Sequence, residues 1–250
     1  MSGPLTVERL GFSYPTRADV LKGVTFAASP GEAVAVIGPS GAGKSTLFRS
    51  LARLARPSSG RVALGEQDLY GPSSARPLRG KIGYVHQQHG LPVTISGAMA
   101  VLGGEMHAWG AGKVLASVVA GPTRAELERV AGVLRRVGLE GREFDRIGEL
   151  SVGQRQRIAV ARTLLQAPAL IVADEPVASV DPTTADTVLR LLAAEAARGA
   201  IVLCSVHDVA KARAHFSRVI ALRQGVLVYD GACEGLTDSV VARVYDECAA

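Results

Sequence analysis

The chain has 250 residues, of which 48% are apolar and 4% aromatic, and its formal net charge is +5. This length suits one large α/β domain or two small ones, and the apolar fraction is sufficient for a core. The 28 basic and 23 acidic residues are scattered, so no run of like charge indicates a nucleic-acid-binding arm, and no nucleic acid is expected as a partner. A weakly basic surface fits an anionic partner such as a nucleotide or a lipid face, and ordinary solubility explains it equally well.

Cysteine use and hydropathy narrow the class of protein. Cys204, Cys233 and Cys248 lack metal-ligand spacing, and Cys204 lies in an apolar run that predicts a buried thiol. An odd number of cysteines without a framework is typical of a reducing compartment. The first residues show no signal pattern, and no segment approaches the roughly 20 apolar residues of a membrane-spanning helix. We therefore expect a soluble chain that reaches a membrane only through a partner.

In chain order, the first thirty residues predict short strands joined by Pro-Gly turns, which is typical of an antiparallel layer. Amphipathic spacing predicts one helix through Leu47, Leu51 and Leu54, and a second helix over 184–198. The middle of the chain, from about 89 to 165, is helical and poor in strand signals.

Short apolar runs predict strands that are covered on both faces, at 33–37, 170–173, 200–205, 218–222 and 226–229. Surface loops rich in Pro, Gly and Ser are expected at 56–60 and 71–77. Strands that alternate with helices indicate an α/β fold with a doubly wound, mostly parallel sheet. The helical middle would then be a lobe inserted between two halves of that sheet.

A glycine-rich loop lies between the strand at 33–37 and the helix that begins before Leu47. Its residues are Gly38, Pro39, Ser40, Gly41, Ala42, Gly43, Lys44 and Ser45, with Thr46 next. A strand, this loop and a helix in that order form a complete phosphate-binding motif. The glycines let backbone N–H groups turn toward phosphates, and the helix N-terminus adds its positive end. We expect Lys44 to reach the β- and γ-phosphates and Ser45 to hold Mg²⁺.

A second apolar strand, 170–173, is followed by the carboxylates Asp174 and Glu175. At the carboxyl edge of a parallel sheet, these side chains would face a nucleotide crevice. Asp174 is expected in the Mg²⁺ shell, and Glu175 is expected to polarise the attacking water. The alternative is two solvated acids that cap a strand, and the phosphate-binding loop weighs against it.

The stretch 150–154, Leu-Ser-Val-Gly-Gln, followed by a helix through Leu165, resembles the signature of the ATP-binding cassette (ABC) family. In that family this helix start faces the γ-phosphate held by the other subunit. The resemblance assigns nucleotide contacts to Ser151, Gly153 and Gln154, at a helix start suited to anions. Val152 replaces a family glycine, and we expect activity to survive because Ser151 and Gly153 are retained.

Further positions of the ABC pattern occur in the family's order. Gln87 resembles the Q-loop glutamine that senses Mg²⁺ and water, and Asp181 belongs to a stretch similar to the D-loop that bridges two subunits. His207 resembles the switch histidine at the γ-phosphate, and Tyr14 resembles the aromatic residue that stacks on adenine. Each residue alone has an ordinary interpretation, such as a capping histidine or a tyrosine packed in a turn. Their shared order favours the family interpretation for Gln87 and His207 above all.

The resemblance implies an α/β P-loop NTPase with a RecA-like parallel sheet core, an N-terminal antiparallel β layer and an inserted helical subdomain. We expect a single domain over 1–250, in which 1–87 and 166–235 form the nucleotide-binding core. The helical subdomain would be 88–165, and 236–250 would be a C-terminal tail. ATP and Mg²⁺ are the implied cofactors, with Ser45, Gln87 and Asp174 as metal-side residues. Because the family's site joins one subunit's loop to another's signature, the chain is expected to form a homodimer or heterodimer.

Some stretches resemble the phosphonate/phosphate-type importer ATPases in particular, namely 103–124, 173–182, 220–225, 229–231 and 236–245. The segment 94–98 lacks the acidic-Asn pattern usual after the Q-loop, where such proteins meet their permeases. For Trp109, a core anchor of the helical lobe is favoured over a family-specific role.

The implied function is ATP hydrolysis that drives an integral membrane permease, with the chain peripheral at the cytoplasmic face of the inner membrane. Import of phosphonate or a related oxyanion leads, with a solute-binding protein in the same system. Amino-acid, metal and lipid-export transporters remain alternatives. An ABC protein acting on ribosomes or DNA is disfavoured because the chain carries one cassette. A kinase or GTPase is disfavoured by the signature and His207.

Overall fold

The structure is a computed structural model that describes residues 3–14, 17–72, 78–86, 90–178 and 180–245. Gln87 lies outside these described residues, so its predicted role at the metal stays a prediction. Within the described ranges, none of the helices combines the length and apolar character required to cross a membrane.

The N-terminal part forms an antiparallel layer, as the sequence predicts. Strands β1 (Leu5–Tyr14) and β2 (Arg17–Ala28) are 10 and 12 residues long, so they are longer than the short strands expected. They pair with β4 (Ser59–Leu64) and β5 (Gln67–Asp68) in the order β2-β1-β4-β5. The predicted loop at 56–60 therefore ends sooner than expected, because Ser59 pairs with Gly11 of β1 and begins β4.

A second sheet of six strands has the order β10-β9-β3-β8-β7-β6. Its members are β3 (Ala33–Ile37), β6 (Ile82–Val85), β7 (Leu170–Ala173), β8 (Ile201–Ser205), β9 (Arg218–Arg223) and β10 (Val226–Ala232). The pairs within β9-β3-β8-β7-β6 are parallel, and only β10 is antiparallel to its neighbour. The predicted strands at 33–37, 170–173, 200–205 and 218–222 are thus confirmed, and their carboxyl ends meet at one edge of the sheet. The run at 226–229 also forms a strand, but the expectation that both of its faces are covered is wrong, because β10 is the edge strand and Val226 and Val228 are exposed.

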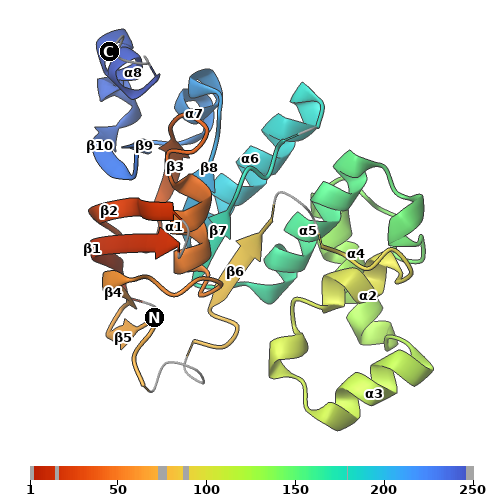
Figure 1. Cartoon of the computed structure of the whole chain (residues 1–250). Helices are drawn as coiled ribbons and strands as arrows, with labels where there is room; N and C mark the ends of the chain where they lie inside the picture. The colour runs from red at the N-terminus through yellow and green to blue at the C-terminus, as the bar shows by residue number, and fades with distance from the viewer. Residues whose placement is uncertain (1–2, 15–16, 73–77, 87–89, 179, 246–250) are drawn as a thin grey trace.

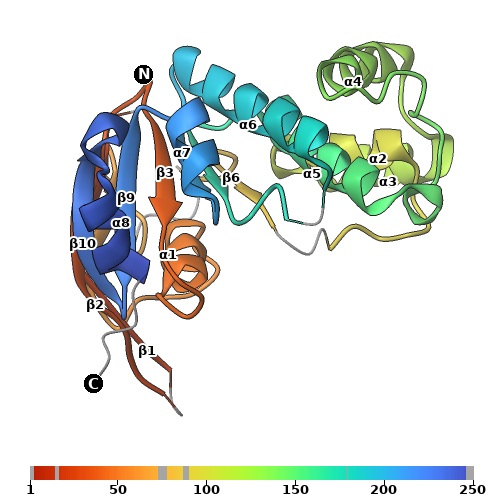
Figure 2. The same cartoon turned by 90° about the horizontal axis from the view of Figure 1, so that it is seen from above.

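The helices divide between the sheet core and a separate lobe (Figure 1). Around the sheet lie α1 (Lys44–Leu51), α6 (Pro182–Ala197), α7 (Val209–His215) and α8 (Asp238–Tyr245). The lobe contains α2 (Gly97–Leu102), α3 (Ala111–Ala120) and α4 (Arg124–Arg136), and α5 (Val152–Gln166) runs from it toward the sheet. Single turns of 3₁₀ helix occur at Met106–Ala108, Ile147–Glu149 and Cys233–Gly235. Figure 2 shows α2, α3 and α4 grouped on the side away from β1, β2 and β10.

The first helix is shorter than predicted. It ends at Leu51, and Arg53 adopts a left-handed backbone conformation with φ of 61°. An α-helix cannot continue through that conformation. Leu54 therefore lies past the helix, with 62% of its surface exposed, and its predicted place on the apolar face of the helix is wrong.

Two hydrophobic clusters lie on opposite faces of the parallel sheet. Along β3, Val34 and Val36 join one cluster, whereas Ala35 and Ile37 join the other, because successive side chains of a strand point to opposite faces. One cluster fills the space between the sheets together with the apolar side chains of α1. The other joins the sheet to α5, α6 and the helical lobe. This two-sided burial explains why β3, β7, β8 and β9 appear in the sequence as continuous apolar runs.

Trp109 and Cys204 are buried, as predicted. Trp109 belongs to the cluster that includes the helical lobe, and the Lys113 ammonium lies 4.4 Å from the centroid of its ring. Lys113 also forms an ion pair with Glu126 at 3.0 Å, which links α3 to α4. Cys204 is fully buried in β8, and burial raises the pKa of its thiol.

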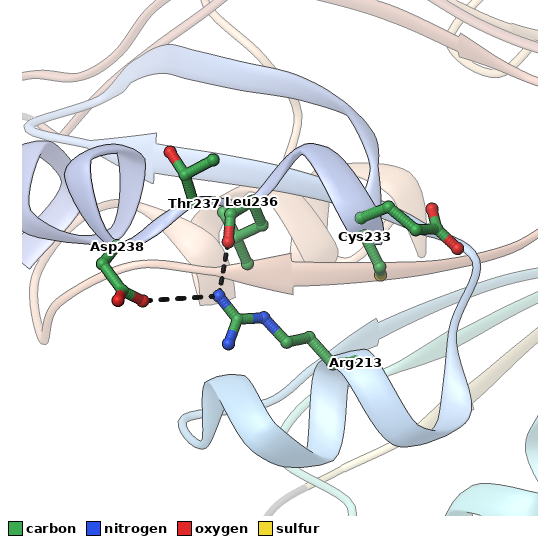
Figure 3. Close-up of a pocket in the computed structure, with 6 residues that line it drawn as sticks. Arg213, Cys233, Leu236, Thr237 and Asp238 are labelled. Atoms are coloured by element: carbon green, nitrogen blue, oxygen red, sulfur yellow. Dashed lines mark hydrogen bonds and ion pairs between the residues drawn. The ribbon is translucent and has the colours of Figure 1, made fainter.

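The C-terminal segment is joined to the core through α7. Figure 3 shows Arg213 of α7 reaching toward Leu236 and Asp238. Its guanidinium donates a hydrogen bond to the Leu236 carbonyl and lies 3.8 Å from the Asp238 carboxylate. A cavity of about 510 Å³ lies beside these residues and Cys233. Val240 and Val244 of α8 are buried in the core, so residues 236–245 of the predicted tail pack as part of the domain, and 246–250 lie outside the described residues.

Candidate nucleotide-binding site

The glycine-rich loop connects β3 to α1 at the carboxyl edge of the parallel sheet. Gly38 and Gly41 have φ of 148° and 78°, values that favour glycine. A Cβ atom on Gly38 would lie 2.2 Å from the Leu222 carbonyl oxygen of β9, whereas a Cβ on Gly41 would meet nothing within 4 Å. Gly38 is therefore required both by its conformation and by the close approach of β9, and Gly41 by its conformation alone.

Lys44 begins α1 and is 5% exposed. Its Nζ donates to the carbonyl oxygens of Gly38 and Pro39, at 2.7 and 3.1 Å, so the loop folds around the ammonium group. Burial lowers the pKa of Lys44, and the negative charges of Glu175 and Asp174 act in the opposite direction. The result is a buried cation beside two acids, at the start of a helix whose N-terminus also attracts anions.

Asp174 follows β7 and is 5% exposed. Its Oδ1 accepts hydrogen bonds from the hydroxyls of Ser45 and Ser205, at 3.3 and 3.1 Å. Its Oδ2 accepts one from the Tyr84 hydroxyl at 3.3 Å. Burial raises the pKa of Tyr84, and the adjacent Asp174 charge raises it further, so Tyr84 stays protonated as a donor. Three hydroxyls thus surround one buried carboxylate.

Glu175 has a left-handed backbone with φ of 49°, which is uncommon for a residue other than glycine. Its N–H donates to the Ser205 hydroxyl oxygen at 2.7 Å. Its carboxylate Oε1 lies 2.5 Å from His207 Nε2, where the His207 side chain is 51% exposed and that of Glu175 is 15% exposed. The Glu175 carboxylate is therefore largely buried, and its histidine partner is half exposed to solvent.

Of the residues described so far, Gly41, Lys44, Ser45 and Glu175 border a cavity of about 310 Å³, whereas Asp174, Ser205, Tyr84 and His207 are not part of its lining. Its lining consists of Tyr14, Val20, Ser40, Gly41, Ala42, Gly43, Lys44, Ser45, Thr46 and Glu175. The Tyr14 ring stands at the rim, 36% exposed, and packs on Phe12 with 4.9 Å between ring centroids. The structure thus brings together the predicted loop, Tyr14 and Glu175. Gly38 and Pro39 lie behind Lys44 and hold it through their carbonyl groups.

The signature residues lie apart from this cavity, at the start of α5 (Figure 1). Ser151 caps α5, because its hydroxyl accepts from the Gln154 N–H at 3.2 Å while the Gln154 side chain accepts from the Ser151 N–H at 2.8 Å. Val152 is 45% exposed, and Gly153 follows it in the first turn of α5. None of these residues lines the cavity described above.

Asp181 likewise caps a helix outside the cavity. Its carboxylate accepts from the Thr184 N–H at 2.9 Å at the start of α6, and hydrogen bonding to the side chain and then the backbone of Thr184 lowers the pKa of Asp181. In one copy of the chain, the predicted residues therefore form two groups. One group lies in and around the glycine-rich loop, and the other lies at the exposed starts of α5 and α6.

Sequence reasoning missed three residues at the site, namely Ser205, Tyr84 and Val20. Ser205 is the polar end of an otherwise apolar strand that lies next to β7, the strand that Asp174 follows. This polar ending is the only signal for Ser205. Tyr84 belongs to β6, which pairs with β7, but a tyrosine in a strand is so common that it gives no signal, and the same holds for Val20 in β2.

Comparison with known proteins identifies this arrangement. The ABC transporter family matches residues 21–178. A Phosphonates import ATP-binding protein PhnC 1 of Rhodopseudomonas palustris (strain BisB18) is 39% identical, over 97% of this chain and 89% of its own length. The protein of the same name from Cupriavidus necator is 42% identical, over 93% and 83% of the two chains.

Solved structures agree with these relatives. The dimeric ATP-binding cassette MJ0796, in a post-hydrolysis state with ADP and Pi, matches with a TM-score of 0.80 and 27% identity, over 92% of this chain and 99% of its own. The cbiO1 protein of Clostridium perfringens, part of the ABC transporter complex cbiONQ, matches with a TM-score of 0.78 and 27% identity, over 97% and 94%. This chain therefore belongs to the ABC transporter family, as an ATP-binding subunit with ATPase activity.

Proposed function

We propose that this chain hydrolyses ATP to drive import of phosphonate or a related oxyanion through a membrane permease. ATP hydrolysis is supported above all by the arrangement of Lys44, Asp174 and Glu175 around one loop. His207 Nε2 lies 2.5 Å from the Glu175 carboxylate. The substrate class is supported by relatives named for phosphonate import that are 39% and 42% identical over almost the whole chain.

Lys44 is the group proposed to hold the β- and γ-phosphates. Its Nζ bonds to the carbonyls of Gly38 and Pro39, which keep the ammonium at the base of the loop. A phosphate oxygen gives a cation a stronger, charge-assisted hydrogen bond than a neutral carbonyl does. The loop residues from Ser40 to Thr46 would cradle the phosphates, and Tyr14 at the cavity rim would stack on adenine.

The metal side of the site suits Mg²⁺. Mg²⁺ prefers oxygen ligands and binds through one or two carboxylates together with substrate phosphates. The Ser45 hydroxyl and the Asp174 carboxylate, 3.3 Å apart, offer that chemistry beside Lys44. Among the described residues, no group of three or more His, Cys, Asp or Glu residues could hold a metal without other ligands. Bound Mg²⁺ would neutralise charge on the phosphates.

Glu175 is proposed as the general base. It would accept a proton from the water that attacks the γ-phosphorus, while the bond from that phosphorus to the β-phosphate oxygen breaks. His207 would orient the Glu175 carboxylate and contact the γ-phosphate. Gln87, outside the described residues, is proposed to sense Mg²⁺ and the water. Catalysis would then consist of positioning and charge stabilisation.

The two separated groups of residues support a dimeric site. Ser151, Gly153 and Gln154 lie at an exposed helix start away from their own loop, so they would act on the nucleotide held by another subunit. Asp181 would lie near the same junction. We propose a homodimer or a heterodimer with another ABC ATPase, in line with the dimeric state named for a solved relative.

The remaining partners are those that an importer role requires. The subunit would sit peripherally at the cytoplasmic face of the inner membrane on integral permease subunits, and a solute-binding protein would deliver the oxyanion. Purification of tagged Glu175→Gln chain from native membranes with ATP and Mg²⁺ tests this assembly. A co-purifying multi-span permease supports it, whereas recovery of ribosomal or DNA-repair proteins alone would overturn it.

Growth tests the substrate. A deletion strain should fail to grow on a phosphonate as the only phosphorus source and should grow normally on inorganic phosphate. The wild-type gene should restore growth, and the Glu175→Gln gene should not. Normal growth of the deletion strain on several phosphonates, with loss of growth on another transported nutrient, would reject the phosphonate assignment and leave the ATPase assignment intact.

A further inference from the structure

Ser205 lies beside Asp174 and Glu175 although no motif includes it. It ends β8, between β3 and β7, where Val36 is its register partner on β3 and Cys204 pairs with Ala173 on β7. The residue is fully buried. Its position therefore places the hydroxyl directly beside the carboxyl end of β7, where the two acids begin.

The Ser205 hydroxyl contacts both acids at once. It donates to Asp174 Oδ1 at 3.1 Å and accepts from the Glu175 N–H at 2.7 Å. A serine hydroxyl can do both because it has one hydrogen and two lone pairs. Leaving a buried polar group without its partner is costly. This single hydroxyl therefore fixes Asp174, the proposed Mg²⁺ ligand, relative to Glu175, the proposed general base.

The Glu175 backbone explains why such a contact is needed. A left-handed conformation with φ of 49° is unfavourable for a glutamate. Such a conformation persists only when surrounding contacts determine it, and the N–H bond to Ser205 is one of these contacts. Two residues further along, His207 reaches the carboxylate of the same glutamate. The end of β8 therefore holds Glu175 by both its backbone and its side chain.

We propose that Ser205 is a positioning residue for ATP hydrolysis, which couples the Mg²⁺-side carboxylate of Asp174 to the water-side carboxylate of Glu175. This inference rests on the proposed roles of those two acids. Tyr84, on the other oxygen of Asp174, assists by fixing the rotation of the carboxylate. If the Ser45 hydroxyl leaves Asp174 to bind Mg²⁺, the hydroxyls of Ser205 and Tyr84 would remain as the donors that hold the Asp174 carboxylate in place.

The test compares Ser205→Ala with Ser205→Thr, which retains a hydroxyl, and with Ser50→Ala as a control. Ser50 is also fully buried, and its hydroxyl donates to the Thr46 carbonyl within α1. Three quantities are measured, namely kcat and KM for ATP, the Mg²⁺ concentration for half-maximal binding of a fluorescent ATP analogue, and hydrogen exchange at the Glu175 amide without nucleotide.

For Ser205→Ala we expect kcat to fall about 10- to 100-fold and the required Mg²⁺ to rise, as is typical when a residue behind a metal ligand is removed. The Glu175 amide should exchange faster, because its acceptor is lost, and binding of the analogue without Mg²⁺ should not change. Ser205→Thr should restore much of kcat. Ser50→Ala should leave all three quantities near those of the wild type.

The outcomes are distinct. Wild-type kcat and wild-type amide exchange in Ser205→Ala would overturn the inference, and so would an equal loss in Ser50→Ala. Wild-type turnover in Glu175→Gln, measured in the same assay, would instead reject the proposed base. If Ser205→Ala fails to fold, Ser205→Cys replaces it, since a thiol fills the site but is a weak donor and acceptor. Wild-type kcat in Ser205→Cys would equally overturn the inference.

Discussion

Replacing Gly38 with alanine should be far more damaging than the same replacement at Gly41, although both glycines belong to one loop. The new methyl group at position 38 would lie 2.2 Å from the backbone carbonyl of Leu222. That oxygen belongs to β9, which pairs with β3 along its length, so it cannot rotate away as a flexible side chain would. The loop or the strand must move.

The expected magnitudes derive from these geometries. At Gly41, with φ of 78° and open space around the Cβ position, alanine carries only the left-handed penalty, about 1–2 kcal/mol. At Gly38, a disfavoured backbone adds about 1–3 kcal/mol and overpacking adds about 1–3 kcal/mol. The sum, about 2–6 kcal/mol, is a large fraction of the stability of a typical domain.

Urea unfolding of the two variants and the wild type, followed by circular dichroism, measures these differences through the midpoint and the slope. Gly41→Ala is the matched control, since it changes the same residue type in the same loop. Equal losses in free energy of unfolding, or a smaller loss for Gly38→Ala, would refute the argument that close approach of β9 distinguishes the two positions.

Two further changes give smaller and separable effects. Tyr70→Phe removes the hydroxyl's hydrogen bonds to the carbonyls of Ser50, in the last turn of α1, and of Ala55, beyond that helix. It should lower the free energy of unfolding by about 1–3 kcal/mol in urea titrations. Burial raises the pKa of Tyr70 from 10.0 to about 12, so between these pH values the unfolded state loses the proton first and wild-type stability falls as pH rises. Tyr70→Phe should weaken this decline, and an unchanged decline would contradict the assignment. Val152→Gly restores the family glycine at an exposed position; turnover should stay near that of the wild type, and a tenfold change in phosphate release would show that Val152 tunes the signature.

The residues found from sequence are those that a local pattern defines. Lys44 and Asp174 each follow an apolar strand, so their place at the carboxyl edge of the sheet is determined by chain direction alone. His207 is recognisable in the same way, after the strand that ends at Ser205. The structure adds that its imidazole lies within hydrogen-bond distance of Glu175, which depends on β7 and β8 being neighbours.

The features that sequence could not supply depend on tertiary contacts or single backbone angles. Ser205 acts through Asp174 and Glu175, which directly follow β7, and the polar end of its apolar strand is also what a serine that begins a turn would show. Leu54 fits the helical repeat, yet the left-handed conformation of Arg53 removes it from the helix. The lengths of β1 and β2 exceed the prediction because their pairing passes through register shifts, which interrupt a simple alternating pattern.

The measurement that most directly tests the central claim is a paired assay of ATP binding and phosphate release for the Glu175→Gln chain. The proposed mechanism predicts ATP affinity like that of the wild type, because the loop and Lys44 are untouched, with phosphate release reduced to background, because the base is lost. A Lys44→Ala chain should instead lose ATP binding. Phosphate release by Glu175→Gln at the wild-type rate would contradict the mechanism, since the carboxylate beside His207 would then not be the base.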